Sequence, residues 1–585
     1  MTDTDRFPAG RLLCLTAAVY LAVVAPCRAL DYYVAVDGAN TNAGRPETDA
    51  WRTIAHAAAN VASGDVINVA TGNYAEWVII TNPVTITGAD VYHPSYPVFS
   101  RHESRTVIRP YDTDNRESAL FTVLTNNVTL QNLTIIGDGD TNGIADIKCG
   151  MYCTNGRPFT VSNCAIYTVG GYGICHVVDG SIPSPSDADD VRSYFGYNTI
   201  TNITHTNAVQ ATGIFLEHVP STVENNAIGN ITGASANAGL YVHSCYYTAG
   251  MARPFVIDYN HFEDCVTAVW ANSFGTDDEP IYIRNNTVTN SVRGIRISEA
   301  KGAAYVGTNN IAVSGVSPGG TPARGLWIEA DYDPWNPLRD TDHQLTHNRI
   351  SGSAANADGS MGMVFRYDSA LPDVDNNGVR AAVLDNDITG FDWGVYVLSG
   401  SNGVTRPHDH PLTEVILHRN NMESNITWCL AAQGNTNPVN AVSNWWGRYD
   451  NPACVVSGNV TYTPYTMGGY RRDTDGDGVD DNIDDDDDSD SLTDAEEVIA
   501  GTDPSDAYSV FQLAGVSREG TNGIKLSWAA ASNRIYSIYR STNILDGFGA
   551  AFTSVPAVYP TNTYTDYEAG DFSPLFYRIS VTNAP

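Results

Sequence analysis

Acidic residues alternate with other residues in a short stretch near the C-terminus, between positions 473 and 497. Two twelve-residue frames follow each other there, and each places oxygen atoms at the positions from which a single loop can surround a cation. The predicted ligands are Asp473, Asp475, Asp477, Val479 (through its carbonyl), Asp481 and Asp484 in the first frame and Asp486, Asp488, Asp490, Asp494 and Glu497 in the second. Six or seven hard oxygen ligands from one loop suit Ca²⁺, so the sequence predicts calcium as a cofactor.

Each frame departs from the usual loop pattern at one position. Ser491 stands where the second loop is expected to have glycine, and Asp484 stands where the first is expected to end in glutamate. These departures leave the affinity for calcium open. The alternative interpretation is a solvated acidic linker, because a run of like charges without a metal repels itself and stays extended.

A second set of candidate residues lies in a five-residue pattern, glycine or alanine followed by apolar, variable, apolar and variable residues. The copies begin at Gly213, Gly239, Ala268, Gly294, Gly325, Gly362 and Gly394. Each copy predicts a short strand whose apolar residues point one way and whose variable residues point the other. The first variable positions hold Phe215, Tyr241, Trp270, Arg296, Trp327, Val364 and Tyr396, and the second hold Glu217, His243, Asn272, Ser298, Glu329, Arg366 and Leu398.

Flat aromatic faces beside polar groups suit a glycan, whose rings stack and whose hydroxyl groups need hydrogen-bond partners. The predicted ligand-binding residues are Phe215, Tyr241, Trp270 and Trp327. The alternative is that these rings stack on one another and only stabilise the fold, or lie under an inserted turn. The sequence leaves both interpretations open.

Catalytic candidates are fewer. Glycosidases need two carboxyl groups about 5 to 9.5 Å apart, whereas Glu217 and Glu329 lie four copies apart, roughly 19 Å at the spacing of adjacent strands. Glu299 and Glu329 lie in neighbouring copies close to Arg296, so these three residues are the candidates if the protein is an enzyme. No complete constellation for a lyase or a hydrolase is recognisable in the sequence.

Asparagine followed two residues later by an apolar residue precedes each copy. The asparagines are Asn198, Asn226, Asn260, Asn286, Asn309, Asn348, Asn386 and Asn420. Variable spacing around a constant core is typical of a solenoid, in which insertions enter the turns. The asparagines are therefore expected to point inward and to form a hydrogen-bonded ladder with one amide in each coil.

These observations predict an all-β protein, a right-handed parallel β-helix solenoid with an acidic calcium-loop linker and a small C-terminal β-sandwich. The opening segment from Tyr33 to Glu76, the repeated NNTV and GIRI units and the SNWWG sequence at residues 443–447 resemble the pectin-lyase-like group of parallel β-helix proteins. The resemblance covers about residues 31 to 470. It implies the fold and little about activity, since this fold hosts lyases, hydrolases, epimerases and proteins without known chemistry.

Four segments are expected: a signal peptide at 1–29, the β-helix at 30–470, the linker at 471–506 and the β-sandwich at 507–585. A helical face between Trp51 and Gly64 predicts a helix that covers the open N-terminal end of the solenoid. The linker resembles thrombospondin type-3-like repeats of exported bacterial proteins. The last segment is similar to type III fibronectin sandwiches, with the final strand missing.

The composition of the chain restricts its possible binding partners and indicates where in or outside the cell it acts. The net charge of −34 disfavours nucleic acid and anionic membranes, and also a polyuronate unless calcium bridges the charges. An apolar run from Leu12 to Ala25, preceded by arginines and followed by small residues, predicts export with no membrane insertion after cleavage. Disulfides or buried thiols are expected for the cysteines, and Cys245 with Cys265 and Cys429 with Cys454 lie one coil apart, where each pair could form a disulfide. Cys149, Cys153, Cys175 and His176 could imitate a zinc site.

The leading hypothesis is a secreted or cell-surface β-helix protein that binds extracellular polysaccharide. The sequence leaves open whether the protein also processes the polysaccharide. If it is an enzyme, a polysaccharide lyase or a glycoside hydrolase is expected. The alternative is a non-catalytic surface or adhesive protein whose β-helix is a rigid rod beside a calcium-stabilised spacer. The sequence does not determine the oligomeric state.

Overall fold

The structure is a computed structural model of the 585-residue chain. It describes residues 29–583 apart from 90–105, 111–118, 138–148, 155–157, 179–191, 206–210, 220, 234–236, 244–254, 273–279, 299, 301, 331–340, 354–358, 368–378, 399–412, 435–437, 449–451, 471, 478, 521–522, 532–533, 559–560 and 570–573. The predicted signal peptide, Glu299, Gly478 and Cys245 therefore lie outside the described residues. Within the described part, no helix is long and apolar enough to cross a membrane.

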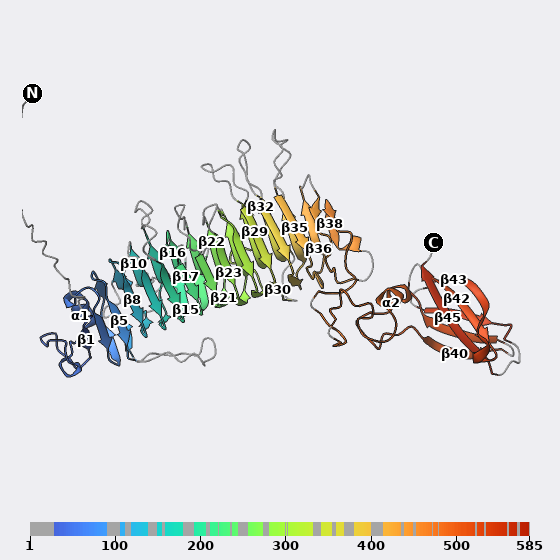
Figure 1. The fold of residues 1–585 in the computed structure, drawn as a ribbon, viewed down its shortest axis with the longest axis horizontal. Coiled ribbons are helices and arrows are strands. Elements are labelled where there is room, and N and C mark those ends of the chain that lie inside the picture. Colours follow the sequence, from blue (N-terminus) through green and yellow to red (C-terminus); the bar gives the residue numbers. More distant parts are fainter. Residues whose placement is uncertain are drawn as a thin grey trace, which may run out of the picture.

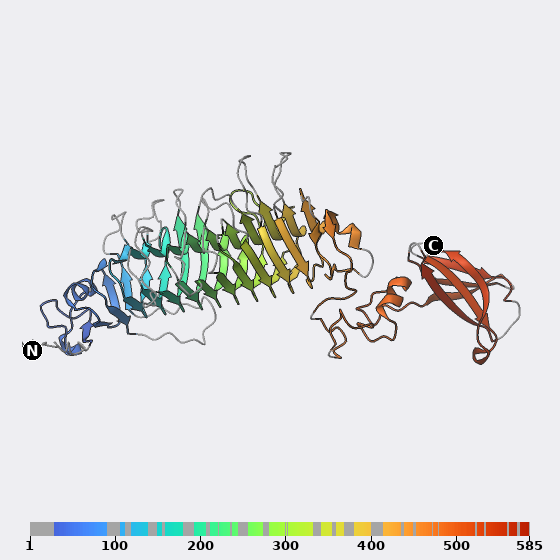
Figure 2. The ribbon, with the colours of Figure 1, turned by 45° about the horizontal axis from the view of Figure 1, so that its top comes forward.

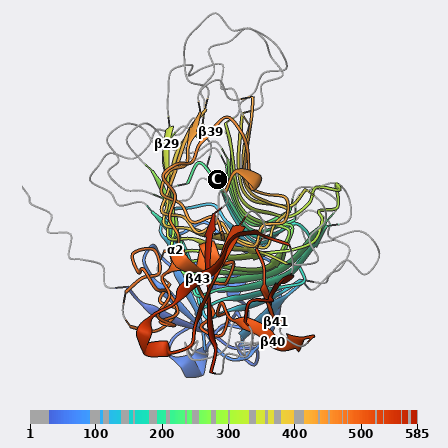
Figure 3. The ribbon, with the colours of Figure 1, turned by 90° about the vertical axis from the view of Figure 1, so that its right-hand side faces the viewer.

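The main body is a right-handed parallel β-helix, as predicted, in which successive coils add a strand to each of three parallel sheets (Figure 1). Sheet A contains β1 (Asp31–Val34), β2 (Val66–Val69), β5 (Thr85–Gly88), β8 (Val128–Gln131), β11 (Phe159–Ser162), β14 (Ser193–Gly196), β17 (Ser221–Glu224), β20 (Phe255–Asp258), β23 (Ile281–Arg284), β26 (Ala304–Gly307), β29 (Thr341–Thr346), β32 (Val379–Leu384), β35 (Thr413–His418), β37 (Val439–Asn440) and β39 (Val460–Thr461). Figure 3, turned so that the C-terminal end faces the viewer, shows the strands of successive coils one behind another.

The other two sheets complete each coil. Sheet B contains β3 (Gly72–Ala75), β6 (Thr106–Arg109), β9 (Thr134–Ile136), β12 (Ala165–Tyr167), β15 (Thr199–His205), β18 (Ala227–Gly233), β21 (His261–Cys265), β24 (Thr287–Ser291), β27 (Asn310–Val313), β30 (Arg349–Gly352) and β33 (Asp387–Thr389). Sheet C contains β4 (Val78–Ile80), β7 (Ala119–Val123), β10 (Cys149–Thr154), β13 (Tyr172–Val177), β16 (Thr212–Glu217), β19 (Ala238–His243), β22 (Thr267–Asn272), β25 (Arg293–Ser298), β28 (Arg324–Ala330), β31 (Met361–Tyr367), β34 (Trp393–Leu398), β36 (Trp428–Gln433) and β38 (Val456–Gly458).

Glycine recurs near the start of the sheet C strands because the core leaves no room for a side chain there. At Gly294 a Cβ atom would lie 2.5 Å from the Cγ2 of Ile311 and 2.3 Å from the carbonyl oxygen of Gly325. The apolar residue after the glycine, Ile295, is also in the core. The residue before the glycine points outward instead, as Arg293 does when its guanidinium reaches the ring of Trp327.

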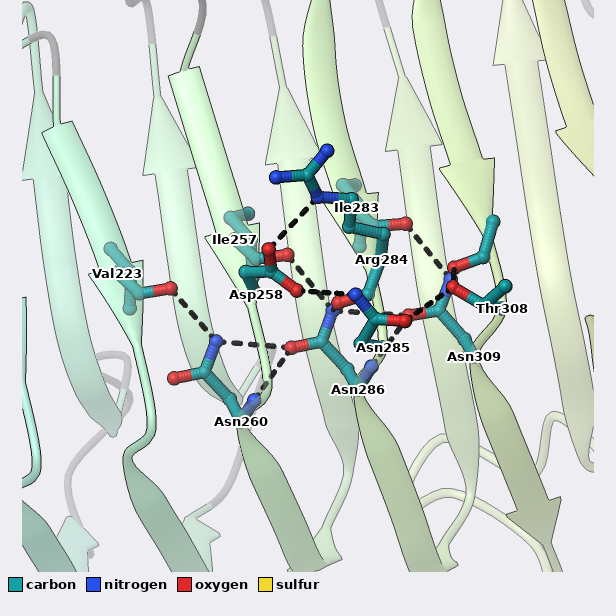
Figure 4. Close-up of polar contacts among 11 residues, drawn as sticks. Val223, Ile257, Asp258, Asn260, Ile283, Arg284, Asn285, Asn286, Thr308 and Asn309 are labelled. Carbon is teal, nitrogen blue, oxygen red and sulfur yellow. Dashed lines mark hydrogen bonds and ion pairs between the residues drawn. The ribbon is translucent and has the colours of Figure 1, made fainter.

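The predicted asparagine ladder is confirmed (Figure 4). Asn260 donates from Nδ2 to Oδ1 of Asn286 at 3.0 Å, and Asn286 donates in the same way to Asn309 at 3.0 Å. The residue before each of these asparagines has a positive φ, which turns the chain from sheet A into sheet B. The ladder continues beyond the predicted Asn420 to Asn444, whose Oδ1 accepts from Asn420 Nδ2 at 2.9 Å.

The N-terminal helix is shorter than predicted. Helix α1 is Ile54–Asn60, whereas the helical face predicted from sequence extended from Trp51 to Gly64. The side chain of Thr53 accepts from the main-chain N–H of His56 and caps the start of the helix. Val61 already has an extended backbone, and the N–H of Ala62 donates to the carboxylate of Asp65, so the helix ends before Gly64.

The cysteines agree with buried thiols better than with disulfides. Cys265 is a buried free thiol, so the predicted Cys245–Cys265 disulfide is not formed. Cys265 sits in the core, where its Sγ donates to the carbonyl of Glu263. The zinc-like residues do not come together as a site: Cys153 packs in the core, while Cys149 and Cys175 belong to a separate outer cluster. Cys149 precedes Gly150 and faces outward, as Arg293 does before Gly294, so Cys149 and Cys153 lie on opposite faces of sheet C although they are four residues apart.

Past the last coil the chain forms an acidic linker and then two antiparallel sheets (Figure 2). One sheet contains β40 (Leu513–Glu519), β41 (Gly523–Ala529) and β44 (Thr561–Asp566), and the other contains β42 (Arg534–Ser541), β43 (Gly549–Pro556) and β45 (Phe576–Asn583). Trp528 and Tyr536 are fully buried between them. The linker contains helix α2 (Asp494–Ala500), and short 3₁₀ turns occur at η1 (Glu47–Asp49), η2 (Pro452–Cys454) and η3 (Ile544–Asp546).

Candidate functional site

The aromatic positions form a column across the outer face of sheet C. Register partners on adjacent strands are Phe215 with Tyr241, Tyr241 with Trp270, Trp270 with Arg296, and Arg296 with Trp327. The five side chains therefore lie on successive coils, as the alternation in the sequence predicts. We call Phe215, Tyr241, Trp270, Arg296 and Trp327 the aromatic column.

Rings in the first part of the aromatic column pack against one another. Phe215 and Tyr241 have ring centroids 5.4 Å apart, and Tyr241 and Trp270 are stacked at 4.5 Å with an interplanar angle of 20°. Tyr241 is only 7% exposed. The ring of Tyr241 is packed between its neighbours, so Tyr241 mainly stabilises the column, whereas the half-buried Phe215 and Trp270 retain surface for a ligand.

Arg296 lies between two indole rings. Its guanidinium carbon is 4.5 Å from the ring centroid of Trp270 and 4.7 Å from that of Trp327. Its Nη2 also donates to Oε2 of Glu329 at 2.9 Å, and the Trp270 Nε1–H donates to Oγ of Ser298 at 2.9 Å. Cation–π contacts and a charged hydrogen bond together hold the guanidinium in one place, so this part of the face is rigid.

The catalytic candidates are only partly placed. Glu329 is 8% exposed and is engaged by Arg296, while Glu299 lies outside the described residues. Glu217 lies on β16 and pairs with Nδ1 of His243 on β19 at 2.9 Å. Three strands of sheet C separate β16 from β28, which agrees with the expected separation of roughly 19 Å between Glu217 and Glu329.

A further outward column was missed by the sequence reasoning. The residues immediately before the core-facing glycines include Tyr172, Arg293 and Arg324. Tyr172 extends the aromatic column, with its ring centroid 5.3 Å from that of Phe215. The sequence shows these residues directly before each glycine. Strict alternation, counted back from the inward-facing apolar residues, places that position in the core, so the outward direction was not predicted.

The first acidic loop brings its alternating carboxylates together. Ligand oxygens of Asp473, Asp475 and Asp477 lie within 4.8 Å of one another, and all three side chains are exposed. Asp481, at position 9, has both carboxylate oxygens engaged by Thr474, from the main-chain N–H at 2.8 Å and from Oγ1 at 2.9 Å. These hydrogen bonds tie the buried Asp481 to the start of the loop, and each oxygen keeps a lone pair with which it could bind a cation.

The second acidic loop is more buried. Ligand oxygens of Asp486, Asp488 and Asp490 lie within 4.8 Å of one another, and Asp494 at position 9 accepts from the N–H of Asp487 at 3.1 Å. Glu497 at position 12 is fully buried. Neither of its carboxylate oxygens has a hydrogen-bond partner in the described part of the chain, and the same holds for one oxygen each of Asp486, Asp488 and Asp490.

The pKa values of two carboxyl groups in the second acidic loop are raised, because burial and neighbouring carboxylates disfavour their ionised forms. Burial, followed by repulsion from Asp488, Asp490 and Asp494, raises the pKa of Glu497 to about 7. Burial likewise raises the pKa of Asp494 to about 6. Buried anions without donors or cations are costly, and a hard divalent cation is the partner that this oxygen set fits. The residues present therefore suit calcium, with Glu497 as the ligand at position 12.

Comparison with known proteins finds matches among solved structures. No family model and no curated protein matches this chain. Among solved structures, XylC in complex with xylose has a TM-score of 0.37 and 11% identity, covering 92% of this chain and 100% of that chain. A GH136 lacto-N-biosidase from Eubacterium ramulus has a TM-score of 0.33 and 11% identity over 74% of this chain and 67% of that one. Pectate lyase Pel9A has a TM-score of 0.31 and 15% identity over 72% and 81%.

Proposed function

We propose that this chain is an exported protein that binds extracellular polysaccharide on the outer face of sheet C, with a calcium-stabilised spacer between the β-helix and the β-sandwich. The observation that carries the proposal is the aromatic column. Trp270 and Trp327 are half-buried and fixed around Arg296, with polar side chains beside them. Preordered rings next to hydrogen-bonding groups are what a sugar ring needs, and fixing them beforehand lowers the entropy cost of binding.

The calcium part of the proposal is supported by the second acidic loop. Asp486, Asp488, Asp490 and Glu497 would hold the ion through oxygens that have no other hydrogen-bond partner in the described residues. When bound, calcium would neutralise these carboxylates and fix the loop ahead of helix α2. In the first loop the exposed Asp473, Asp475 and Asp477 would hold a second ion, with less burial to strengthen it.

The alternative function is a non-catalytic surface or adhesive protein with the β-helix as a rod. The packing of Tyr241 against Phe215 and Trp270 favours it, because rings in contact with one another stabilise a solenoid without any ligand. The ion pair between Arg296 and Glu329 is equally compatible with a structural role. Binding and cleavage measurements on the purified protein separate these possibilities.

The deciding experiment tests Trp270→Ala together with Trp327→Ala in the full chain. Retention on a panel of extracellular polysaccharides is measured by affinity electrophoresis, and release of new reducing ends measures processing. The matched control is Tyr282→Ala with Tyr305→Ala, a pair of rings stacked at 5.0 Å on sheet A. We expect the tryptophan variant to lose binding with an unchanged circular dichroism spectrum and the tyrosine variant to retain it. Unchanged binding by the tryptophan variant would leave the rod as the better description.

A further inference from the structure

Four arginines gather on three consecutive strands of sheet C. Strands β25, β28 and β31 carry Arg293, Arg296, Arg324 and Arg366 with Glu329 as their single carboxylate, a net charge of +3 from four cations and one anion. The whole chain has a net charge of −34. We call these four residues the arginine patch.

The strand register places the arginine patch on neighbouring coils. Arg293 on β25 lies beside Arg324 on β28, and Glu329 on β28 lies beside Arg366 on β31, as register partners in adjacent strands. Arg293 also lies over the ring of Trp327, 5.6 Å from its centroid. The patch therefore surrounds the C-terminal end of the aromatic column, with all four side chains partly exposed.

Two of these cations, Arg293 and Arg324, form no ion pair with a carboxylate among the described residues. Arg324 donates from Nη1 to the carbonyl oxygens of Gly359 at 2.6 Å and of Ala323 at 3.0 Å. The Nε atoms of Arg293 and Arg296 are buried and have no hydrogen-bond acceptor in the described part of the chain. The ion pair of Arg296 with Glu329 is the one charge pairing that the structure records within the patch.

Burial and mutual repulsion lower the pKa values of Arg324 and Arg293. The pKa of Arg324 is lowered to about 10, first by burial and then by the charge of Arg293. The pKa of Arg293 is lowered by burial and by Arg296, and the opposing effect of Glu329 is smaller. Half-buried cations that repel one another gain more from an incoming anion than solvated surface arginines do.

We infer that the arginine patch is a subsite for the anionic group of an acidic polysaccharide, either the carboxylate of a uronic acid or a sulfate ester. The inference rests on the proposed function and narrows its ligand class. The planar guanidinium forks match both anions with paired hydrogen bonds, and Trp270 and Trp327 provide apolar surface for the adjoining sugar ring. The net charge of the whole chain still works against a polyuronate, whereas the three strands that carry the aromatic surface have a local charge that favours one.

The test measures binding of the full-length protein to polygalacturonate, κ-carrageenan and a neutral β-glucan. Polygalacturonate carries carboxylates and κ-carrageenan carries sulfate esters, so the better ligand identifies the anion. The test variant is Arg293→Gln with Arg324→Gln, and Arg293→Lys with Arg324→Lys keeps the charge while removing the fork. The matched control is Arg349→Gln, which removes one exposed arginine from sheet B.

We expect the glutamine variant to bind the acidic glycan about tenfold more weakly or worse, and the lysine variant to recover part of the loss. Arg349→Gln should bind as the wild type does, and unchanged melting temperatures establish that the variants fold. Equal affinity of the glutamine variant and the wild type, or a wild-type preference for neutral β-glucan, overturns the arginine assignment and leaves polysaccharide binding intact. Failure of the wild type to bind any of the three glycans, or any other on the wider panel, removes the proposed function itself.

Discussion

Side chains on the outer face of sheet C serve either packing or ligand binding, and their types alone do not separate these tasks. Tyr241 is 7% exposed between Phe215 and Trp270 and contributes mainly to packing. Trp270 and Trp327 are more exposed and hold Arg296 between them. The sequence correctly places all five on one face through alternation, but which rings remain accessible depends on neighbouring coils.

His343 is a buried histidine whose effect on the free energy of unfolding can be measured as a function of pH. It is 2% exposed on β29, and its Nδ1 accepts from the N–H of Ala304 at 3.1 Å. Burial lowers its pKa to about 4. The unfolded chain, with a histidine pKa of about 6.5, then binds more protons than the folded chain between these values. His343 therefore lowers the stability of the fold as the pH falls from about 6.5 towards 4.

The prediction for His343 compares stability at two pH values. Lowering the pH from 7 to 5 should cost the wild type about 1.4 kcal/mol per pH unit below 6.5 through this residue. His343→Gln should lack that part of the loss, although it is expected to be less stable at pH 7. Urea unfolding of both proteins measures the difference. An identical pH dependence in the two proteins would contradict a neutral, buried His343.

At the scale of elements, the coil depends on the corner between sheets A and B. There Asn286 Nδ2 and the main-chain N–H of Asn286 both donate to Oδ1 of Asn309, each at 3.0 Å. Asn309 in turn donates to the carbonyl of Ile283 at 2.9 Å. Because these groups are inaccessible to water, removal of one amide leaves several buried donors and acceptors without partners.

Asn309→Ala should therefore destabilise the β-helix by about 2 to 4 kcal/mol. The matched control is Asn310→Ala, since Asn310 is the next residue and is exposed at the start of β27. The midpoint of urea unfolding should fall clearly for Asn309→Ala and stay within error for Asn310→Ala. Similar midpoints for the two variants would show that the ladder is dispensable at this coil.

The elements also show what sequence can and cannot predict. Strand positions, the ladder and the C-terminal sheets follow from local periodicity, because each coil uses the same inward positions. The outward direction of Arg293 does not follow, since the bend at Gly294 breaks the alternation. Helix α1 ends early for a similar reason, as Asp65 binds the N–H of Ala62 through a contact that periodicity does not contain. The sequence also does not show that the four arginines of the arginine patch lie together, because insertions between coils of variable length separate them along the chain.

At the scale of the whole molecule, helix α2 connects the acidic loops to the β-sandwich (Figure 1). Glu497 belongs both to the second loop and to this helix. At the other end of α2, Arg534 of β42 donates from Nε to the carbonyl of Ile499 at 2.8 Å and from Nη2 to that of Val498 at 2.9 Å. A cation at a helix C-terminus satisfies carbonyls that lack intrahelical partners.

Calcium bound through Glu497 should therefore fix the β-sandwich as well as the loop. We expect chelation of calcium by EGTA to raise the radius of gyration of the full chain in small-angle scattering and to speed proteolysis within residues 471–506. Glu497→Gln should show the same change with calcium present, because it loses a charged ligand at position 12. Glu496→Gln is the matched control, since Glu496 is exposed and glutamine preserves its capping-box role. A wild-type chain with identical scattering and cleavage in calcium and EGTA would show that the spacer is rigid without the metal.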